Sequence, residues 1–191
     1  AEAYVLRNAS VADLLKLDPT EGVYRAILGR AKVKLSDLDN ALTGLAKTLK
    51  KKKVEVLMGL IKAAQEGASA GLSGLGKLLA SQPAKDLGGV VRELKTLASG
   101  AKTSEVRQLC YGALIAAAGA GDEVYRLASV SKDGLRDFLA AVPNVGDKKV
   151  RAGLYSKVKS LVSKLPANLK AEPGGSDVRK SGIQVDFFAP H

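Results

Sequence analysis

Cysteine, histidine and tryptophan are almost absent from this chain of 191 residues, which has one cysteine, one histidine and no tryptophan. A single Cys110 excludes an internal disulfide and any Cys-x-x-Cys site for a metal or a haem. The one histidine, His191, follows Pro190 at the last position, and we do not interpret it as a metal ligand. The residues therefore predict no metal and no other cofactor.

Aromatic residues and long apolar runs are also scarce. Aromatic residues make up 4% of the chain, whereas alanine, leucine, glycine and lysine are plentiful. This composition suits close-packed helices and argues against an all-β sandwich or barrel. The apolar run from Ala113 to Ala120 is far shorter than the roughly 18–20 residues that cross a bilayer. The sequence predicts no membrane span.

Positive charge is present in excess. Thirty lysines and arginines face 19 acidic residues, which gives a formal net charge of +11. Such a charge attracts polyanions, acidic proteins and anionic surfaces. Charge alone does not choose between a nucleic acid and an acidic protein as the partner.

One segment of the chain repeats. Val106–Leu114 returns 44 residues later as Val150–Val158, with the same Val-Arg start and with Tyr111 matched by Tyr155. Periods of about 40–47 residues are typical of HEAT and armadillo repeats. The sequence therefore predicts an all-α protein, a right-handed α-solenoid of HEAT-like helix pairs with a short extended C-terminal tail.

Apolar residues at helical spacing, with caps and breakers between them, define the expected helices. They cover residues 10–15, 18–28, 36–49, 54–64, 69–79, 87–97, 104–118, 122–130, 131–142 and 147–165. Asp18 and Pro19 are expected to open the second of them. The helix over 131–142 has one expected apolar face, made of Leu135, Phe138, Leu139 and Val142.

Three glycines, Gly71, Gly74 and Gly76, fall at the start of the helix over 69–79. Each costs about 1 kcal/mol relative to alanine inside a helix. We therefore expect this helix to be either the least stable of the set or the one that a neighbour approaches most closely.

Both ends of the chain differ from the repeats. Residues 1–5 resemble the remnant of a secretion leader, or alternatively a native terminus after signal cleavage, and both interpretations imply export. We assign residues 6–171 to the helical domain and 172–191 to a linker and an extended tail, in which apolar and polar residues alternate over 183–187 as in a strand. This tail either folds back over the last helix pair or begins a further domain. The expected location is extracytoplasmic, periplasmic or secreted.

Four segments carry a family resemblance: Val23–Leu28, Leu42–Lys47, Leu135–Pro143 and Val150–Val158. Together they resemble the HEAT-like helical region of large exported proteins from planctomycete-type bacteria, over most of residues 20–166. In that family the helical region stands beside a propeller, a c-type haem domain or carbohydrate-associated β domains. The resemblance implies the role of a spacer or a docking surface. It brings no haem site, because the required Cys-x-x-Cys-His motif has no match in this chain.

The densest charged cluster is the candidate surface for an anionic partner, and its members are Lys47, Lys50, Lys51, Lys52, Lys53 and Lys62. The alternative interpretation is a solvated loop. No aromatic residue stands among these lysines, and single-strand nucleic-acid binding uses aromatic stacking platforms. The cluster could thus bind a phosphate or a carboxylate-rich partner, the lack of aromatic residues weakens the case for nucleic acid, and we favour the solvated loop.

The repeated positions are the candidate repeat-stacking residues, namely Val106, Arg107, Tyr111, Val150, Arg151 and Tyr155. The two arginines either form a ladder for anionic partners or bond to carbonyls and acids of the neighbouring turn, and we favour the second option. The two tyrosines either stack a base or a sugar or pack between repeats with a hydroxyl that reaches solvent. We favour packing.

No catalytic constellation is recognisable. Cys110 has no base beside it and is expected to be a small buried hydrophobe. The paired acids, Asp37 with Asp39 and Asp122 with Glu123, stand at helix starts, where capping and the helix dipole explain them.

We therefore predict a non-catalytic helical-repeat scaffold or protein-interaction module of a larger exported protein, bound to a protein partner or a neighbouring domain. The alternatives are a basic HEAT-like nucleic-acid-binding protein, such as a DNA-repair protein, and an accessory module of a secreted redox or carbohydrate-active protein. The sequence leaves the oligomeric state open.

Overall fold

The structure, a computed structural model, describes residues 2–65, 70–119 and 121–163, and every regular element within these ranges is a helix. The elements are α1 (Glu2–Asn8), α2 (Val11–Leu14), α3 (Glu21–Leu28), α4 (Leu35–Leu49), α5 (Lys53–Ala64), α6 (Leu72–Ala80), α7 (Ala84–Gly88), α8 (Val91–Gly100), α9 (Ser104–Ala118), α10 (Asp122–Ala128), α11 (Lys132–Ala141), the 3-10 helix η1 (Val142–Asn144) and α12 (Lys148–Ser163). The predicted all-α class is confirmed. The expected strand over 183–187 and the boundary at 171 lie outside the described residues.

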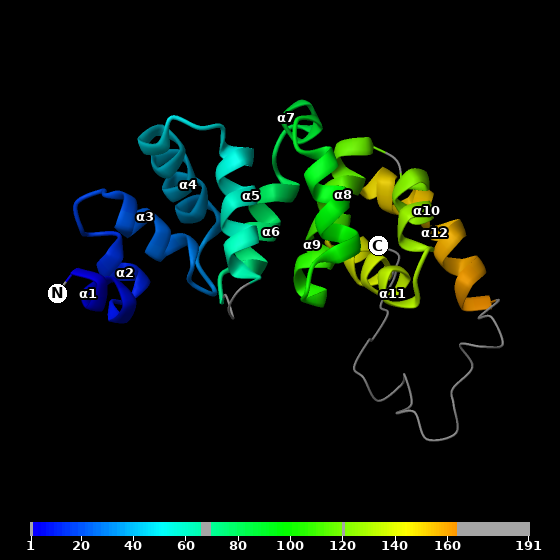
Figure 1. Ribbon diagram of the computed structural model, residues 1–191, viewed down its shortest axis with the longest axis horizontal. Coiled ribbons are helices and arrows are strands. Elements are labelled where there is room, and N and C mark those ends of the chain that lie inside the picture. The colour runs from blue at the N-terminus through cyan, green and yellow to red at the C-terminus, as the bar shows by residue number, and fades with distance from the viewer. Residues whose placement is uncertain (1, 66–69, 120, 164–191) are drawn as a thin grey trace, which may run out of the picture.

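The helices follow one another along the long axis of the molecule (Figure 1). α1 to α3 form one end, α4 to α6 come next, and α10 to α12 lie at the opposite end beyond α7 to α9. None of the helices in the described ranges is long and apolar enough to cross a membrane.

The N-terminal helices begin differently from the prediction. Asp18 and Pro19 do not open α3; Thr20 does, because its hydroxyl accepts a hydrogen bond from the backbone N–H of Val23 at 3.3 Å. Residues 2–5, which we had set apart from the domain, are part of α1. The Arg30 side chain holds the end of α1 in place, since its Nη2 donates to the carbonyl oxygens of Leu6, Arg7 and Ala9.

The helix expected over residues 87–97 is two helices, α7 and α8. The chain bends between them at Gly89 and Val90, and the backbone N–H of Gly89 bonds to the carbonyl of Asp86. The apolar spacing continues through the bend, because Leu87, Val90 and Leu94 are all buried. Periodicity alone therefore could not show it.

Helix α9 is the centre of the C-terminal half. It packs against α6, α7 and α8 on the N-terminal side and against α11 on the other. Its buried residues are Val106, Cys110, Tyr111, Gly112, Ala113, Leu114 and Ile115. A helix buried on several sides joins the elements around it into one core.

The described part of the C-terminal half contains two successions of three helices. α7, α8 and α9 have 5, 10 and 15 residues, and α10, α11 and α12 have 7, 10 and 16. The long helices of the two units begin at Ser104 and Lys148, which are 44 positions apart. A short, a medium and a long helix thus occur twice, but the short helices begin at 84 and 122 and the medium helices at 91 and 132, so only the long helices keep the 44-residue spacing.

The glycine-rich helix α6 is approached closely by its neighbours. A Cβ atom at Gly71 would lie 2.3 Å from the carbonyl oxygen of Leu28, and one at Gly74 would lie 2.8 Å from a methyl carbon of Leu38. Both distances are shorter than van der Waals contact, so a side chain does not fit there without movement. Of the two expectations for this helix, close approach is the one observed.

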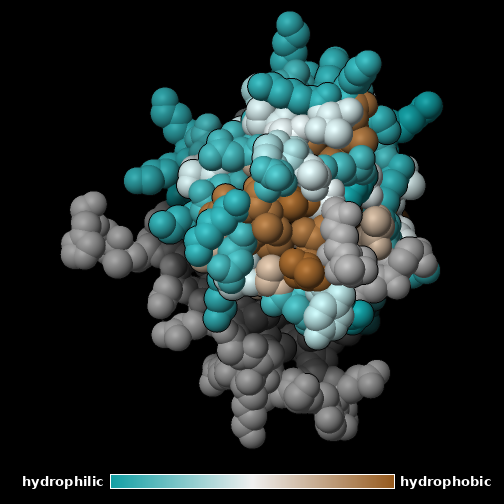
Figure 2. Space-filling model, turned by 90° about the vertical axis from the view of Figure 1, so that its left-hand side faces the viewer, coloured by the Kyte–Doolittle hydropathy of each residue, from teal (hydrophilic) through white to brown (hydrophobic). Residues whose placement is uncertain are grey.

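The N-terminal end of the molecule exposes apolar side chains. Figure 2 views this end and shows an apolar area with hydrophilic residues around it. The large apolar residues exposed within the first 35 positions are Tyr4, Val5, Leu15, Leu17 and Leu35.

Candidate interaction surfaces

Five lysines meet where α4 ends and α5 begins, and we call them the lysine turn: Lys47, Lys50, Lys51, Lys52 and Lys53. Lys50 adopts the left-handed conformation with a φ of 52°, which reverses the chain after α4. The side chains of Lys47 and of Lys50 to Lys52 are exposed. The turn therefore presents several ammonium groups to solvent on one short stretch of chain.

Among the described residues, one lysine of this turn forms an ion pair. Lys53 forms an ion pair with Asp39 of α4, with 2.7 Å between Nζ and Oδ1. The structure places Lys62, the sixth lysine of the candidate surface, nine residues further along α5, about 14 Å away at 1.5 Å per residue. There Lys62 pairs with Glu93 of α8, so it does not extend the lysine turn.

The helix ends sharpen the electrostatics of the lysine turn. Lys47 lies in the last turn of α4, where the helix dipole favours a cation. Lys51 to Lys53 lie at the start of α5, where the helix dipole disfavours a cation. The nearby carboxylate of Glu55 accepts a hydrogen bond from the backbone N–H of Lys52 at 3.2 Å. An anionic group bound at the turn would reduce the repulsion among these charges.

A fully buried carboxylate, Asp137 of α11, lies against α9. Arg107 Nε donates to Asp137 Oδ2 at 2.6 Å, and the Ser104 hydroxyl donates to Oδ1. Gln108 Nε2 is 3.4 Å from the same Oδ1, and Arg136 adds a longer ion pair at 3.7 Å. Within the described residues Asp137 is the only charged residue that is buried.

The hydrogen bonds decide the charge state of Asp137. Burial by itself raises the pKa of a carboxyl group. The hydrogen bonds from Ser104, Arg107 and Gln108, together with the positive charge of Arg107, outweigh burial and hold the pKa of Asp137 below its ordinary value. The carboxylate is therefore ionised at neutral pH and joins α11 to α9.

Sequence reasoning missed Asp137 because the apolar face that it assigned to this helix overlaps the buried face only in part: Phe138 and Val142 are buried as expected. The residues of α11 that are buried are Gly134, Asp137, Phe138 and Ala141, whereas Leu135 and Leu139 are only partly buried. Positions 134, 137, 138 and 141 follow the i, i+3, i+4, i+7 pattern of one helix face. The small residues Gly134 and Ala141 could have indicated that this face is packed closely against another helix. The larger leucines, however, favoured the adjacent face as the buried one.

Arg107 and Arg151, at matched repeat positions, make the same backbone contacts. Arg107 Nη1 donates to the carbonyls of Ala101 and Lys102, at 2.8 and 3.4 Å. Arg151 Nη1 donates to the carbonyls of Val145 and Gly146, which are the residues 44 positions later. The arginines thus bond to carbonyls just before their own helices, and Arg107 also bonds an acid.

The two tyrosines differ in environment. Tyr111 is 1% exposed, and its ring meets Phe138 edge to face with 6.1 Å between the ring centroids. We had expected its hydroxyl to reach solvent, and this expectation was wrong. Tyr155 is 45% exposed. Val106 is fully buried and Val150 is partly buried. The difference follows from α11, which covers α9 at this face.

Cys110 is fully buried in α9. Burial, with a smaller effect of Glu93, raises the pKa of its thiol to about 12. A thiol with this pKa is neutral at physiological pH and is a poor nucleophile. The prediction of a small buried hydrophobe is confirmed.

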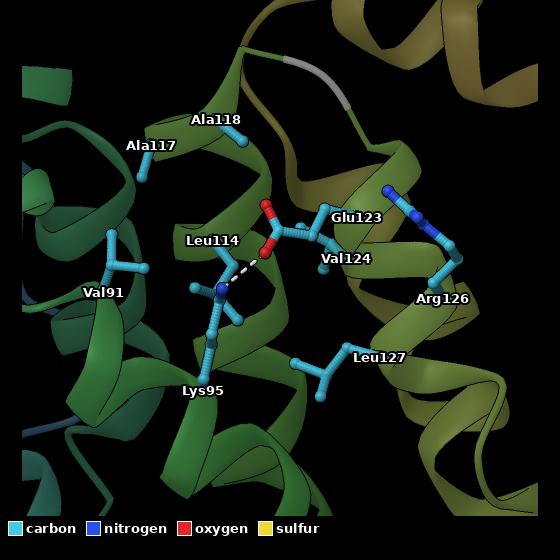
Figure 3. A pocket seen from close by; sticks show the side chains of 9 residues that line it. All are labelled: Val91, Lys95, Leu114, Ala117, Ala118, Glu123, Val124, Arg126 and Leu127. Carbon is cyan, nitrogen blue, oxygen red and sulfur yellow. Dashed lines mark hydrogen bonds and ion pairs between the residues drawn. The ribbon is translucent and has the colours of Figure 1, made fainter.

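A hollow of about 520 Å³ lies between α8, α9 and α10 (Figure 3). Lys95 and Glu123 point toward each other across it and form an ion pair of 2.5 Å, which lowers the pKa of Glu123. The rest of the lining is mainly aliphatic. The two charges in the hollow thus neutralise each other.

The described part of the chain contains no group of three or more His, Cys, Asp or Glu side chains that could hold a metal ion. Of the paired acids, Asp39 and Glu123 bind Lys53 and Lys95. Comparison of the chain with protein-family models, with curated protein sequences and with solved structures finds no match.

Proposed function

We propose that this chain is a non-catalytic helical interaction module whose lysine turn binds an acidic segment of a partner protein. The observation that carries the proposal is the set of exposed lysines between α4 and α5, of which Lys53 alone has an ion pair among the described contacts. Net charge of +11 adds a long-range attraction for acidic partners.

The alternative partner, nucleic acid, shares the same attraction. The lysine turn contains no arginine and no aromatic side chain. Bidentate phosphate and base contacts use arginine, and single-strand binding uses aromatic stacking. An acidic protein segment needs neither, and this favours it.

The order of the helices along one axis supports the solenoid part of the proposal (Figure 1). The succession of a short, a medium and a long helix, in α7 to α9 and again in α10 to α12, also supports it. Export stays a prediction from residues 1–5 and from the family resemblance, and membership of a larger protein with further domains stays a prediction from the resemblance.

The test uses fluorescence anisotropy with two labelled probes, a glutamate-rich peptide and a random DNA duplex. In the full chain, Lys50, Lys51 and Lys52 are all replaced by glutamine. Exposed ion pairs contribute about 0.5 kcal/mol each, so we expect peptide affinity to fall about tenfold. Salt should weaken binding of the unmodified chain as well.

The matched control replaces Lys34, Lys77 and Lys85, three exposed lysines elsewhere, and changes the net charge equally. We expect it to weaken peptide binding about twofold at most. Equal losses in the two triple variants would contradict the proposal, because net charge alone would then explain binding. Tighter binding of the duplex than of the peptide at about 200 mM salt, with a steep salt dependence, would assign the surface to nucleic acid instead.

A further inference from the structure

The start of α9 and the start of α12 present the same helix face in two different states. On α9 the face consists of Ser104, Arg107, Gln108 and Tyr111, at i, i+3, i+4 and i+7. It is covered by α11, whose Asp137 accepts hydrogen bonds from the first three and whose Phe138 meets Tyr111. The occupant of this face is therefore a helix with adjacent acidic and aromatic residues.

On α12 the matched positions, 44 residues later, are Lys148, Arg151, Ala152 and Tyr155. Arg151 is held by the carbonyls of Val145 and Gly146, as Arg107 is held by those of Ala101 and Lys102. The guanidinium of Arg151 is thus held by the same kind of backbone contacts as the guanidinium of Arg107, which faces Asp137. Lys148 and Tyr155 are exposed.

No carboxylate of the described residues pairs with Arg151 or Lys148. Lys148 stands where α9 has Ser104, so the α12 face has two cations where the α9 face has one. A carboxylate that becomes buried needs cationic or hydrogen-bonding partners, and Arg151 and Lys148 can supply them on the α12 face as Arg107 and Ser104 do on the α9 face.

We propose that this face of α12 binds a helix of a partner protein that carries an aspartate followed by an aromatic residue. The aspartate lies between Arg151 and Lys148, and the aromatic ring packs on the edge of Tyr155, as Asp137 and Phe138 do on α9. The proposal involves none of the residues of the lysine turn and does not depend on it.

Two other occupants are less suited. A second copy of this chain already uses its own Asp137 in a buried contact with α9. The chain has one more Asp-Phe pair, Asp186 and Phe187, but the alternation over 183–187 predicts an extended segment rather than a helix. A separate helical partner therefore fits the template best.

The experiment uses a labelled peptide of residues 130–143 as the probe and the full chain as the receptor, with binding followed by fluorescence anisotropy. We expect the probe to bind, and an Asp137→Asn change in the peptide to weaken binding about tenfold, since charge-assisted hydrogen bonds are the strong ones. This arm leaves the receptor unchanged, so it does not depend on the folding of any variant.

In the receptor, Arg151→Gln should weaken binding about tenfold, while Arg92→Gln, an exposed arginine of α8, should change it less than about twofold. Thermal unfolding of both variants checks that the fold is retained. Absence of binding, or binding that ignores Arg151, overturns the proposal; the second result would mean that the probe replaces α11 on α9.

A double change, Asp186→Asn with Phe187→Ala, tests the chain's own pair in the full-length protein. We expect it to leave the affinity for the probe unchanged. If the probe binds only to this double variant, the face is filled by the chain itself and the proposal of a separate partner is wrong.

Discussion

Arg107 Nε lies 2.6 Å from Asp137 Oδ2, and this pair joins helices that are 30 residues apart in sequence. Removing one member of a buried ion pair leaves the other without compensation. We expect Asp137→Ala to lower the free energy of unfolding by about 3 kcal/mol. Urea denaturation monitored by circular dichroism measures the change.

The matched control is Asp133→Ala in the same helix. Asp133 pairs with Arg136 at the surface, with both side chains well exposed. Such a pair contributes about 0.5 kcal/mol or less. If both variants lost a similar free energy of unfolding, the cause would lie in α11 itself and not in the burial of Asp137.

Asp137 also makes stability depend on pH. Its pKa in the folded chain is below the ordinary value of 3.8, so the unfolded chain takes up the proton first as the pH falls. The stabilisation is complete well above 3.8 and is lost as the pH falls through the lower, folded pKa. The stability difference between the natural chain and Asp137→Asn should therefore shrink between neutral pH and about pH 2. A constant difference over this range would contradict the lowered pKa.

Cys110 should be unreactive in the folded protein. With a pKa of about 12 and full burial, almost no thiolate is present or accessible at about pH 8. We expect a chromogenic disulfide reagent to label one thiol per chain in strong denaturant and almost none without it. Rapid stoichiometric labelling of the native chain would show that α9 opens readily.

Gly71 and Gly59 should respond in opposite directions to alanine. At Gly71 the new Cβ would meet the carbonyl oxygen of Leu28, and backbone atoms cannot move aside cheaply, so we expect a loss of about 1–3 kcal/mol. At Gly59, inside α5, an added methyl group would have no neighbouring atom within 4 Å beyond its own helix backbone, and alanine there should add about 0.5–1 kcal/mol through helix propensity. Thermal and urea unfolding of the two variants provide the comparison.

Local sequence signals located most helices because their ends are marked by side chains that act locally. The range 104–118 agrees with α9, where Thr103 accepts a hydrogen bond from the N–H of Val106 and Gly119 takes a positive φ of 60°. The break at Gly89 was missed, because the buried residues on its two sides keep a helical spacing.

The parts that failed depend on distant contacts. Nothing beside Asp137 in the sequence shows that Ser104, Arg107 and Gln108 would surround it, since these residues come from another helix. Likewise Tyr111 and Tyr155 have the same local pattern and opposite exposure, because only α9 has α11 over it. For the lysine turn, the neighbouring lysines were recognisable from the sequence, whereas the distance of Lys62 and its pairing with Glu93 required the fold.

The position of Asp137 also determines where the chain can be divided. A fragment that ended at Gly119 would contain α9 in full and would still lack the carboxylate that neutralises Arg107, because that carboxylate belongs to the next unit. Limited proteolysis or expression of single units should therefore give fragments that aggregate or stay partly unfolded. Because α6 also packs against α9, the shortest autonomous piece around α9 must run from α6 through α11, which is longer than one repeat of the sequence.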